Sequence, residues 1–463
     1  MITMKEMSLE QITNAVHGTY HGNIEKKSQE ITGVSIDSRK IDNGYLFVPI
    51  KGERVDGHDF IAQTAVNGAL CTLCEHPPVD VDIPYILVDS CTQALKDLAK
   101  YYRSTLDIKV IGITGSVGKT STKEMIASVL SQKYQVLKTE GNYNNEIGLP
   151  LTIFRIRDKH EIAILEMGIS NFGEMNNLAD IARPDIGVIT NIGSAHIEHL
   201  KDQAGIMKAK TEMFDHLKPN ATVLLNGDDA MLSTITAVQG RAPIFFGLSN
   251  TLDVYADDIE ANGLRGTSCT LHLGHESITV NIPLPGQHMV YNALAGAYLG
   301  HLFGLTNAQI KIGLATSMPI AGRTNVIKTD SFFIIDDCYN ANPVSMKGAL
   351  DLLAKVPTRS IAILGDMFEL GDNEESLHYD IGTYAANHNI NLICCVGALS
   401  KQMYKGAKAS STTSKTLYFQ TKEALISQLP LILQENDTIL VKASNGMKFP
   451  EILNILKDLV ISR

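Results

Sequence analysis

A glycine-rich segment ending in Lys and Thr is the clearest chemical signal in the sequence. GITGSVGKTS covers residues 112–121, closes the apolar run DIKVIGIT and opens the helix-forming run KTSTKEMIASVL. Backbone amides of such a loop cradle phosphate oxygens, its lysine pairs with the β- and γ-phosphates, and its threonine binds Mg²⁺. Ile113 stands where the usual pattern has its first glycine, so the loop is a relaxed variant. The residues expected to bind ATP here are Gly115, Ser116, Gly118, Lys119, Thr120 and Ser121.

Two polar residues end apolar runs that follow this loop. Glu166 closes EIAILE, and His196 lies in NIGSAHIEH directly after GVIT. Ligands gather at the carboxyl ends of parallel strands, so we expect both side chains to lie near the phosphates. A carboxylate there suits Mg²⁺, which prefers oxygen ligands. Taken singly, each residue is more often a solvated glutamate or a structural histidine.

A lysine in the segment AGIMKAKTEMFDHL, residues 204–217, is predicted to point inward. At 100° per residue, Lys210 falls on the helix face that carries Ile206, Met213 and Leu217, whereas Lys208 lies opposite. Such a lysine either extends its amine along the apolar surface to solvent or is held inside for function. Spacing alone does not separate these two interpretations.

The elements that position these residues alternate between strand and helix patterns in two series. At 463 residues the chain exceeds one ordinary hydrophobic core. We predict an α/β fold of three domains: a small N-terminal α/β domain at 1–87, a central phosphate-loop domain with a parallel sheet at 88–320, and a doubly wound, Rossmann-like domain at 321–463. Residues 251–283 are rich in β-formers and should extend the central sheet. Pro319 and Gly322 suit a hinge before the last domain.

Composition excludes several classes of function. Apolar residues make up 44% of the chain and charged residues 19%, which is typical of a globular protein. The net charge of -10, without a block of like charges, argues against nucleic acid or an anionic membrane as a partner. The chain starts without a signal-peptide pattern and has no stretch of 18 apolar residues, so we expect a cytoplasmic protein without membrane insertion. Seven scattered cysteines, including the pair Cys71 and Cys74, fit reduced and buried thiols better than disulfides or a zinc site.

Several segments resemble the Mur ligases, the family that builds the peptide stem of bacterial cell-wall precursors. In chain order they are GITGSVGKTS, GNYNNEIGLPLT, EMGIS, TNIGSAHIEHL, AKTEMF, GRTN and DDCYNANPVSM. The segment DSRKIDNGYLFVPIKGERVDGHDFI is similar to the uridine-nucleotide-binding domain of the same enzymes. The resemblance spans nearly the whole chain. The Tyr-Asn-Ala-Asn-Pro segment and the N-terminal segment are most similar to the members that add D-alanyl-D-alanine to UDP-N-acetylmuramoyl-tripeptide.

The resemblance implies a peptide-bond-forming ligase of peptidoglycan synthesis. In this family ATP phosphorylates the terminal carboxylate of the UDP-muramoyl peptide, an amine attacks the acyl phosphate, and phosphate leaves from a tetrahedral intermediate. The implied small-molecule partners are ATP, UDP-N-acetylmuramoyl-tripeptide and D-alanyl-D-alanine, with two Mg²⁺ ions; we expect a monomer. Phosphoryl transfer depends mainly on positioning and charge neutralisation, which suits a site with few acid or base groups.

The matching motifs also imply roles for individual residues. The implied catalytic residues are Lys119, Glu166, His196 and Lys210. The implied Mg²⁺ ligands are Thr120, Glu166, His196 and Lys210. Lys210 is similar to the lysine that the family carbamylates. The implied ATP contacts outside the phosphate loop are Asn292, Arg323, Asp337 and Tyr339. The implied substrate contacts are Ser35, Asp37, Ser38, Arg39, Asn144, Asn145, Asn340 and Asn342. Since three of the ATP contacts lie beyond the hinge, domain closure would complete the site.

Three departures from the family pattern and three alternatives accompany this interpretation. Met289 follows His288 where the family has asparagine, and Asn445 stands where it has arginine. The Asp-Asn-Pro-Arg segment of the diaminopimelate-adding relatives is absent. The alternatives are a sister ligase that adds the third amino acid, a folylpolyglutamate-type synthetase and, in a different class, a phosphate-loop kinase or regulatory NTPase.

Overall fold

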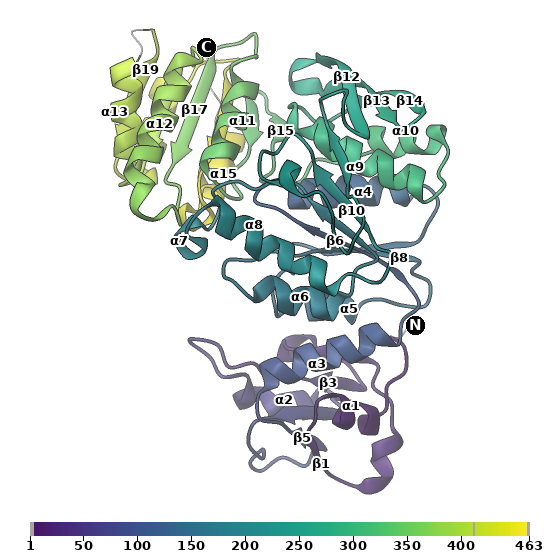
Figure 1. Ribbon diagram of the computed structural model, residues 1–463. Coiled ribbons are helices and arrows are strands. Elements are labelled where there is room, and N and C mark those ends of the chain that lie inside the picture. Colours follow the sequence, from purple (N-terminus) through teal and green to yellow (C-terminus); the bar gives the residue numbers. More distant parts are fainter. Residues whose placement is uncertain (1–3, 411–412, 461–463) are drawn as a thin grey trace.

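Three β-sheets, each with its own helices, follow one another along the chain (Figure 1). The computed structural model describes residues 4–410 and 413–460. The predicted fold class, α/β with three domains, is confirmed. The domain boundaries at 87/88 and 320/321 stay predictions.

The N-terminal sheet has five short strands in the order β1-β5-β4-β3-β2, parallel except for β1. Its strands are β1 (Thr19–His21), β2 (Gly33–Ser35), β3 (Tyr45–Phe47), β4 (Cys71–Cys74) and β5 (Tyr85–Leu87), and its helices are α1 (Leu9–Ala15) and α2 (Ile61–Val66). Every residue of β4 is buried, and both of its cysteines are free thiols, as the sequence predicted. Helix α3 (Cys91–Ser104) packs on α1 and on helices of the central unit, so it joins the two units (Figure 1).

The central sheet has nine strands in the order β14-β13-β12-β11-β10-β9-β6-β8-β7. Its strands are β6 (Lys109–Thr114), β7 (Val136–Lys138), β8 (Ile162–Glu166), β9 (Ile186–Ile189), β10 (Thr222–Asn226), β11 (Ile244–Gly247), β12 (Val254–Ala261), β13 (Thr267–Leu273) and β14 (Glu276–Ile282). Strands β8 and β9 are buried along their whole length, which explains their continuous apolar runs. The expected extension at 251–283 is confirmed, because β12, β13 and β14 form an antiparallel edge.

Helices cover both faces of the central sheet. Those on the side of the N-terminal unit are α5 (Gly148–Ile153), α6 (Glu174–Ala182) and α8 (Gln203–Thr211); the opposite side carries α4 (Lys119–Leu130), α9 (His288–Leu302) and α10 (Asn307–Ala315) (Figure 1). The short helix α7 (Ile197–Leu200) lies beside the C-terminal unit (Figure 1). The helix predicted at 204–217 is shorter than expected. It ends at Thr211, and residues 212–216 continue as a 3-10 helix in which the Glu212 carboxylate accepts hydrogen bonds from the start of α6.

The C-terminal sheet has six strands in the order β15-β16-β20-β17-β18-β19, parallel except for the first. Its strands are β15 (Asn325–Lys328), β16 (Phe333–Asp336), β17 (Ser360–Gly365), β18 (Leu392–Val396), β19 (Lys415–Phe419) and β20 (Thr438–Lys442). Its helices are α11 (Pro343–Leu353), α12 (Glu374–Asn387), α13 (Ser400–Ser410), α14 (Lys422–Ile432) and α15 (Pro450–Asp458). None of the helices in the described ranges is long and apolar enough to cross a membrane.

Candidate active site

A cavity of about 930 Å³ lies between the central and C-terminal units. Its wall combines the phosphate loop and the strand ends of the central sheet with the segment that follows the hinge and the start of α11. Of the residues predicted from the sequence, the cavity brings together Ser116, Gly118, Lys119, Thr120, Ser121, Asn144, Asn145, Glu166, His196, Asn292, Arg323, Asp337, Tyr339, Asn340 and Asn342. Segments more than 200 residues apart therefore meet at one site.

The phosphate loop has the backbone that its glycines predict. Gly118 adopts a left-handed conformation, φ 85°, immediately before α4 begins at Lys119. Gly115 has φ 147°, and a Cβ atom there would lie 2.0 Å from the Thr190 hydroxyl, so only glycine fits. The Lys119 ammonium donates to the carbonyl of Gly115 at 2.8 Å. Burial lowers the pKa of Lys119, and the nearby Glu166 carboxylate opposes this shift.

Glu166 forms the acidic centre of the cavity wall. It is the last residue of β8 and is 1% exposed. Its Oε1 accepts hydrogen bonds from the Thr120 hydroxyl at 3.1 Å and from the Asn144 amide at 2.9 Å. Its Oε2 is buried and has no hydrogen-bond partner among the described residues.

These oxygen donors fit Mg²⁺. Oε1 of this buried carboxylate and the Thr120 hydroxyl lie side by side at the cavity, and such oxygen donors at the start of a phosphate-loop helix are what a hard divalent cation prefers. Within residues 4–410 and 413–460, no three His, Cys, Asp or Glu side chains converge as a metal cluster. Glu166 and Thr120 are thus the protein groups best placed to hold a metal ion together with nucleotide phosphates.

Lys210 points inward, as its helix position predicted. It is 1% exposed, Ile206 and Met213 of the same predicted face are buried as well, and Lys210 is not part of the cavity wall. Burial, and secondarily the charge of Lys119, lowers the pKa of Lys210 well below the usual range of a lysine. Its amine is consequently biased toward the neutral form, which is the form that reacts as a nucleophile.

His196 connects the central unit to the C-terminal unit. Its backbone is left-handed, φ 60°, at the start of α7, and its Nδ1 lies 2.6 Å from Oε2 of Glu369. Burial lowers the pKa of His196, while the Glu369 carboxylate opposes this change. A metal ion bound at the other ring nitrogen would leave this contact intact.

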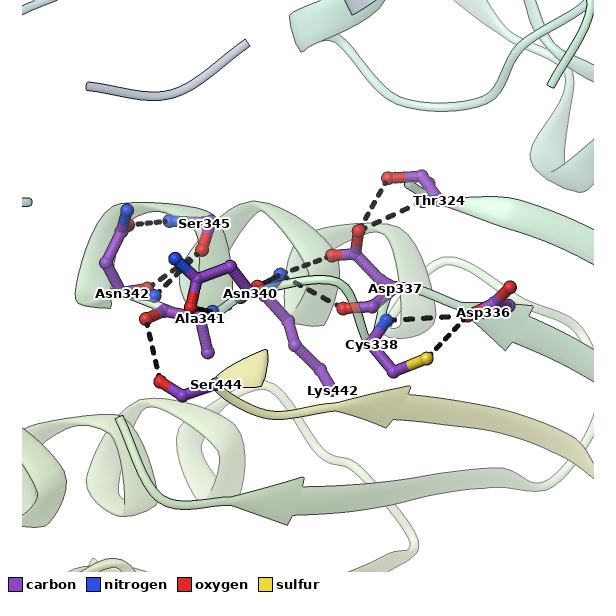
Figure 2. A network of polar contacts seen from close by, with 10 residues as sticks. All are labelled: Thr324, Asp336, Asp337, Cys338, Asn340, Ala341, Asn342, Ser345, Lys442 and Ser444. Carbon is purple, nitrogen blue, oxygen red and sulfur yellow. Dashed lines mark hydrogen bonds and ion pairs between the residues drawn. The ribbon is translucent and has the colours of Figure 1, made fainter. Parts of the chain in front are cut away.

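The segment after β16 is fixed by a buried lysine from β20 (Figure 2). The Lys442 ammonium donates to the carboxylate of Asp337 at 2.6 Å and to the carbonyl of Asn340 at 3.1 Å. The other oxygen of Asp337 accepts from the backbone N–H of Thr324 at 3.0 Å. Asn342 and Ser345 cap the start of α11 reciprocally. This network holds the backbone that carries Tyr339, Asn340 and Asn342 into the cavity.

Lys442→Met should destabilise the C-terminal sheet. Removing one partner of a buried ion pair leaves the other charge uncompensated, which costs about 3–5 kcal/mol. We expect hydrogen exchange of the amides in β16 and β20 to accelerate accordingly, whereas Lys415→Met, a change at an exposed lysine of the edge strand, should leave those amides protected. Equal exchange in the two variants would contradict this account of Lys442.

Two predicted nucleotide contacts are positioned by neighbouring side chains. The Arg323 guanidinium stacks 3.9 Å from the ring centre of Tyr339, and its Nη2 lies 3.5 Å from the Thr120 hydroxyl. Asn292 accepts a hydrogen bond from Thr122 of α4 at 2.8 Å and donates to the sulfur of Met289. Met289, which stands where the family pattern has asparagine, therefore helps to orient the side chain of Asn292.

Five predicted residues lie outside the cavity wall in addition to Lys210: Gly115, Ser35, Asp37, Ser38 and Arg39. Gly115 supplies the carbonyl that binds Lys119. The other four belong to the N-terminal unit, where Asp37 caps a short 3-10 helix and pairs with Arg39 at 2.8 Å. The structure thus separates this group from the phosphate loop.

The cavity also contains residues that sequence reasoning missed. They include Glu174 at the start of α6, Asp228 and Asp229 after β10, and His288 and Tyr291 of α9. The pair Asp228 and Asp229 carried a usable signal, because it follows an apolar strand of the same parallel sheet. Glu174 and Tyr291 carried none, since their place depends on helix packing.

Comparisons with known proteins match nearly the whole chain. Three family models match: "Mur ligase family, catalytic domain" at residues 30–103, "Mur ligase middle domain" at 113–300 and "Mur ligase, glutamate ligase domain" at 322–445. A relative from Bacillus subtilis (strain 168), named UDP-N-acetylmuramoyl-tripeptide--D-alanyl-D-alanine ligase, is 38% identical over 99% of both chains. A crystal structure of MurF from Acinetobacter baumannii superposes with a TM-score of 0.91 at 31% identity, covering 99% of this chain and 100% of that one. MurF ligase from Thermotoga maritima in complex with ADP gives 0.82 at 29% identity, covering 92% and 97%.

Fold and site together define an ATP-dependent ligase built around a phosphate loop. The chain belongs to the Mur ligase family.

Proposed function

We propose that this ligase joins D-alanyl-D-alanine to the terminal carboxylate of UDP-N-acetylmuramoyl-tripeptide in peptidoglycan precursor synthesis, consuming ATP. The observation that carries the proposal is the shared cavity. The phosphate loop and Glu166 enter it from the central unit, and the Tyr339–Asn342 segment enters it from the C-terminal unit. The name of the full-length Bacillus relative supports the choice of substrates.

The reaction consists of two balanced steps on the substrate. A carboxylate oxygen of the tripeptide attacks the γ-phosphorus of ATP, which releases ADP and forms an acyl phosphate. The amine of the dipeptide then attacks the acyl carbon, loses a proton, and expels inorganic phosphate. Lys119 neutralises charge on the transferring phosphoryl group, and Arg323, stacked on Tyr339 beside Thr120, approaches from the other unit.

Bound Mg²⁺ would supply further neutralisation of phosphate charge. Glu166 and the Thr120 hydroxyl would hold one ion, and His196 and Lys210 belong to the proposed set for a second. We propose that Lys210 reacts as a neutral amine with carbon dioxide, releasing a proton and forming a carbamate. Its burial and lowered pKa support this step, because only the neutral amine is nucleophilic.

The N-terminal unit completes the substrate site in this proposal. Ser35, Asp37, Ser38 and Arg39 would bind the uridine diphosphate, and Asn144 and Asn145 the muramoyl peptide. Asn340 and Asn342 would position the incoming dipeptide. We further propose that the protein acts as a monomer in the cytoplasm, where ATP and these precursors are available.

Stoichiometric phosphate release tests the class of reaction. The purified chain with Mg²⁺ and ATP should release phosphate only when both the UDP-muramoyl peptide and an amine are present. A phosphate-loop kinase or regulatory NTPase would release phosphate, or transfer it, without the amine. Release that is independent of the amine would therefore contradict the ligase proposal.

A further inference from the structure

A second lysine of α4 lies directly behind the glutamate of the cavity wall. Lys123 follows Lys119 by four residues, so both extend from the same face of the helix. It is 1% exposed and is among the largest fully buried side chains. Its ammonium donates to the carbonyl of Thr139 at 2.7 Å and lies 3.5 Å from Oε2 of Glu166. Lys123 is not part of the cavity wall.

The two carboxylate oxygens of Glu166 have different surroundings. Oε1 is held by Thr120 and Asn144, which both line the cavity. Oε2 has no hydrogen-bond partner among the described residues and faces the ammonium of Lys123. A charged carboxylate in such a dry place requires a compensating charge. Lys123 is therefore the cation on the inner side of Glu166.

The ion pair between Glu124 and Lys138 leaves the positive charge of Lys123 available to Glu166. The ammonium of Lys123 also lies 3.3 Å from Glu124, but Glu124 has a second partner in the half-exposed Lys138 of β7. Lys138 compensates Glu124 from the solvent side, whereas Lys123 approaches Glu166 from inside and Lys119 from the phosphate loop. Lys119 in turn is bound to the Gly115 carbonyl within the phosphate loop.

We propose that Lys123 is an internal counter-ion that neutralises Glu166 whenever no metal ion is bound there, and thereby sets how tightly the site binds a free divalent cation. The inference rests on the proposed metal role of Glu166. Lys123 and a metal ion both compensate the charge of the Glu166 carboxylate, so each reduces the stabilising effect of the other. By thermodynamic reciprocity, removal of Lys123 should tighten metal binding, and bound metal should reduce the loss of folding stability that removal of Lys123 causes, by the same free energy.

Lys123→Met and Lys123→Gln test this coupling in the full-length chain without nucleotide. Lys123→Met removes the charge and keeps most of the stem; Lys123→Gln also keeps an N–H donor for the Thr139 carbonyl, and carries the measurement should the first variant not fold. Both should unfold at a lower temperature than the parent protein in metal-free buffer. Saturating Mn²⁺ should narrow that difference, and the dissociation constant for Mn²⁺ should fall about 5-fold or more.

Lys100→Met is the control, because Lys100 is a half-exposed lysine that pairs with Asp180 and with neither Glu124 nor Glu166. Its effect on unfolding should be the same with and without Mn²⁺. If Lys123 had a purely structural role, the effect of its substitution on the unfolding temperature would likewise be the same with and without Mn²⁺. A weaker or unchanged Mn²⁺ affinity in both Lys123 variants would overturn the proposal. Glu166→Gln distinguishes failure of the counter-ion role from failure of the metal role. Weaker Mn²⁺ binding by Glu166→Gln supports the metal role of Glu166 whatever the Lys123 variants show, whereas Mn²⁺ binding as tight as in the parent protein would overturn both roles.

Discussion

Lys119→Ala should yield a folded protein with almost no turnover. Among the residues that the structure describes, the Lys119 ammonium makes one hydrogen bond, to the Gly115 carbonyl, and it lines the cavity. Its loss therefore removes a charge that acts on the transferring phosphoryl group, and little that stabilises the fold. We expect kcat/KM to fall by at least about 10²–10³-fold, the usual effect of losing one electrostatic group aimed at a transition state.

Circular dichroism and thermal unfolding decide whether this loss is chemical. Both should match the parent protein, as should those of Lys159→Ala, an exposed lysine used as a control that should also keep full activity. Activity of Lys119→Ala close to that of the parent protein would remove Lys119 from the site.

Lys210→Ala should also reduce kcat, by about 10²–10³-fold, because it removes a group that in our proposal holds a catalytic metal ion. A small carboxylate such as formate or acetate should partly restore activity, because it supplies the oxygen ligands of the missing carbamate. Lys210→Arg should fail as well, since a guanidinium keeps its positive charge and does not form a carbamate under these conditions.

Labelled carbon dioxide gives a readout of Lys210 that does not depend on activity. The parent protein should show a carbamate resonance in NMR spectra after equilibration with isotope-labelled carbon dioxide, and Lys210→Arg should lack it. An active Lys210→Arg enzyme would contradict the carbamate and leave a plain cationic role for this residue.

Local features of the site were predictable from the sequence because they depend on short segments. Gly115 and Gly118 require a backbone that only glycine tolerates there, so the loop before α4 follows from residue type alone. Glu166 ends a buried strand, and its position next to the loop follows from the parallel arrangement of β6 and β8. Helical periodicity likewise predicted the inward side chain of Lys210, although not the end of its helix at Thr211.

Contacts between distant segments were not predictable. Lys442 meets Asp337 across 105 residues because β20 lies beside β16, and no local pattern encodes that strand order. The pairing of His196 with Glu369 depends on how the C-terminal unit meets the central unit. Lys123 reads as an ordinary helix lysine in the sequence, and its burial results from the packing of α4 against β7 and β8.

Substrate choice tests the central claim most directly. ATP-dependent product formation would be measured with D-alanyl-D-alanine, D-alanine, L-lysine and diaminopimelate, each against the UDP-muramoyl-tripeptide and the shorter dipeptide precursor. We predict product with D-alanyl-D-alanine on the tripeptide precursor, and rejection of single D-alanine by about 5- to 150-fold, because each buried polar group left unpaired costs about 1–3 kcal/mol. Preferential addition of L-lysine or diaminopimelate to the dipeptide precursor would contradict the account and identify the chain as the sister ligase.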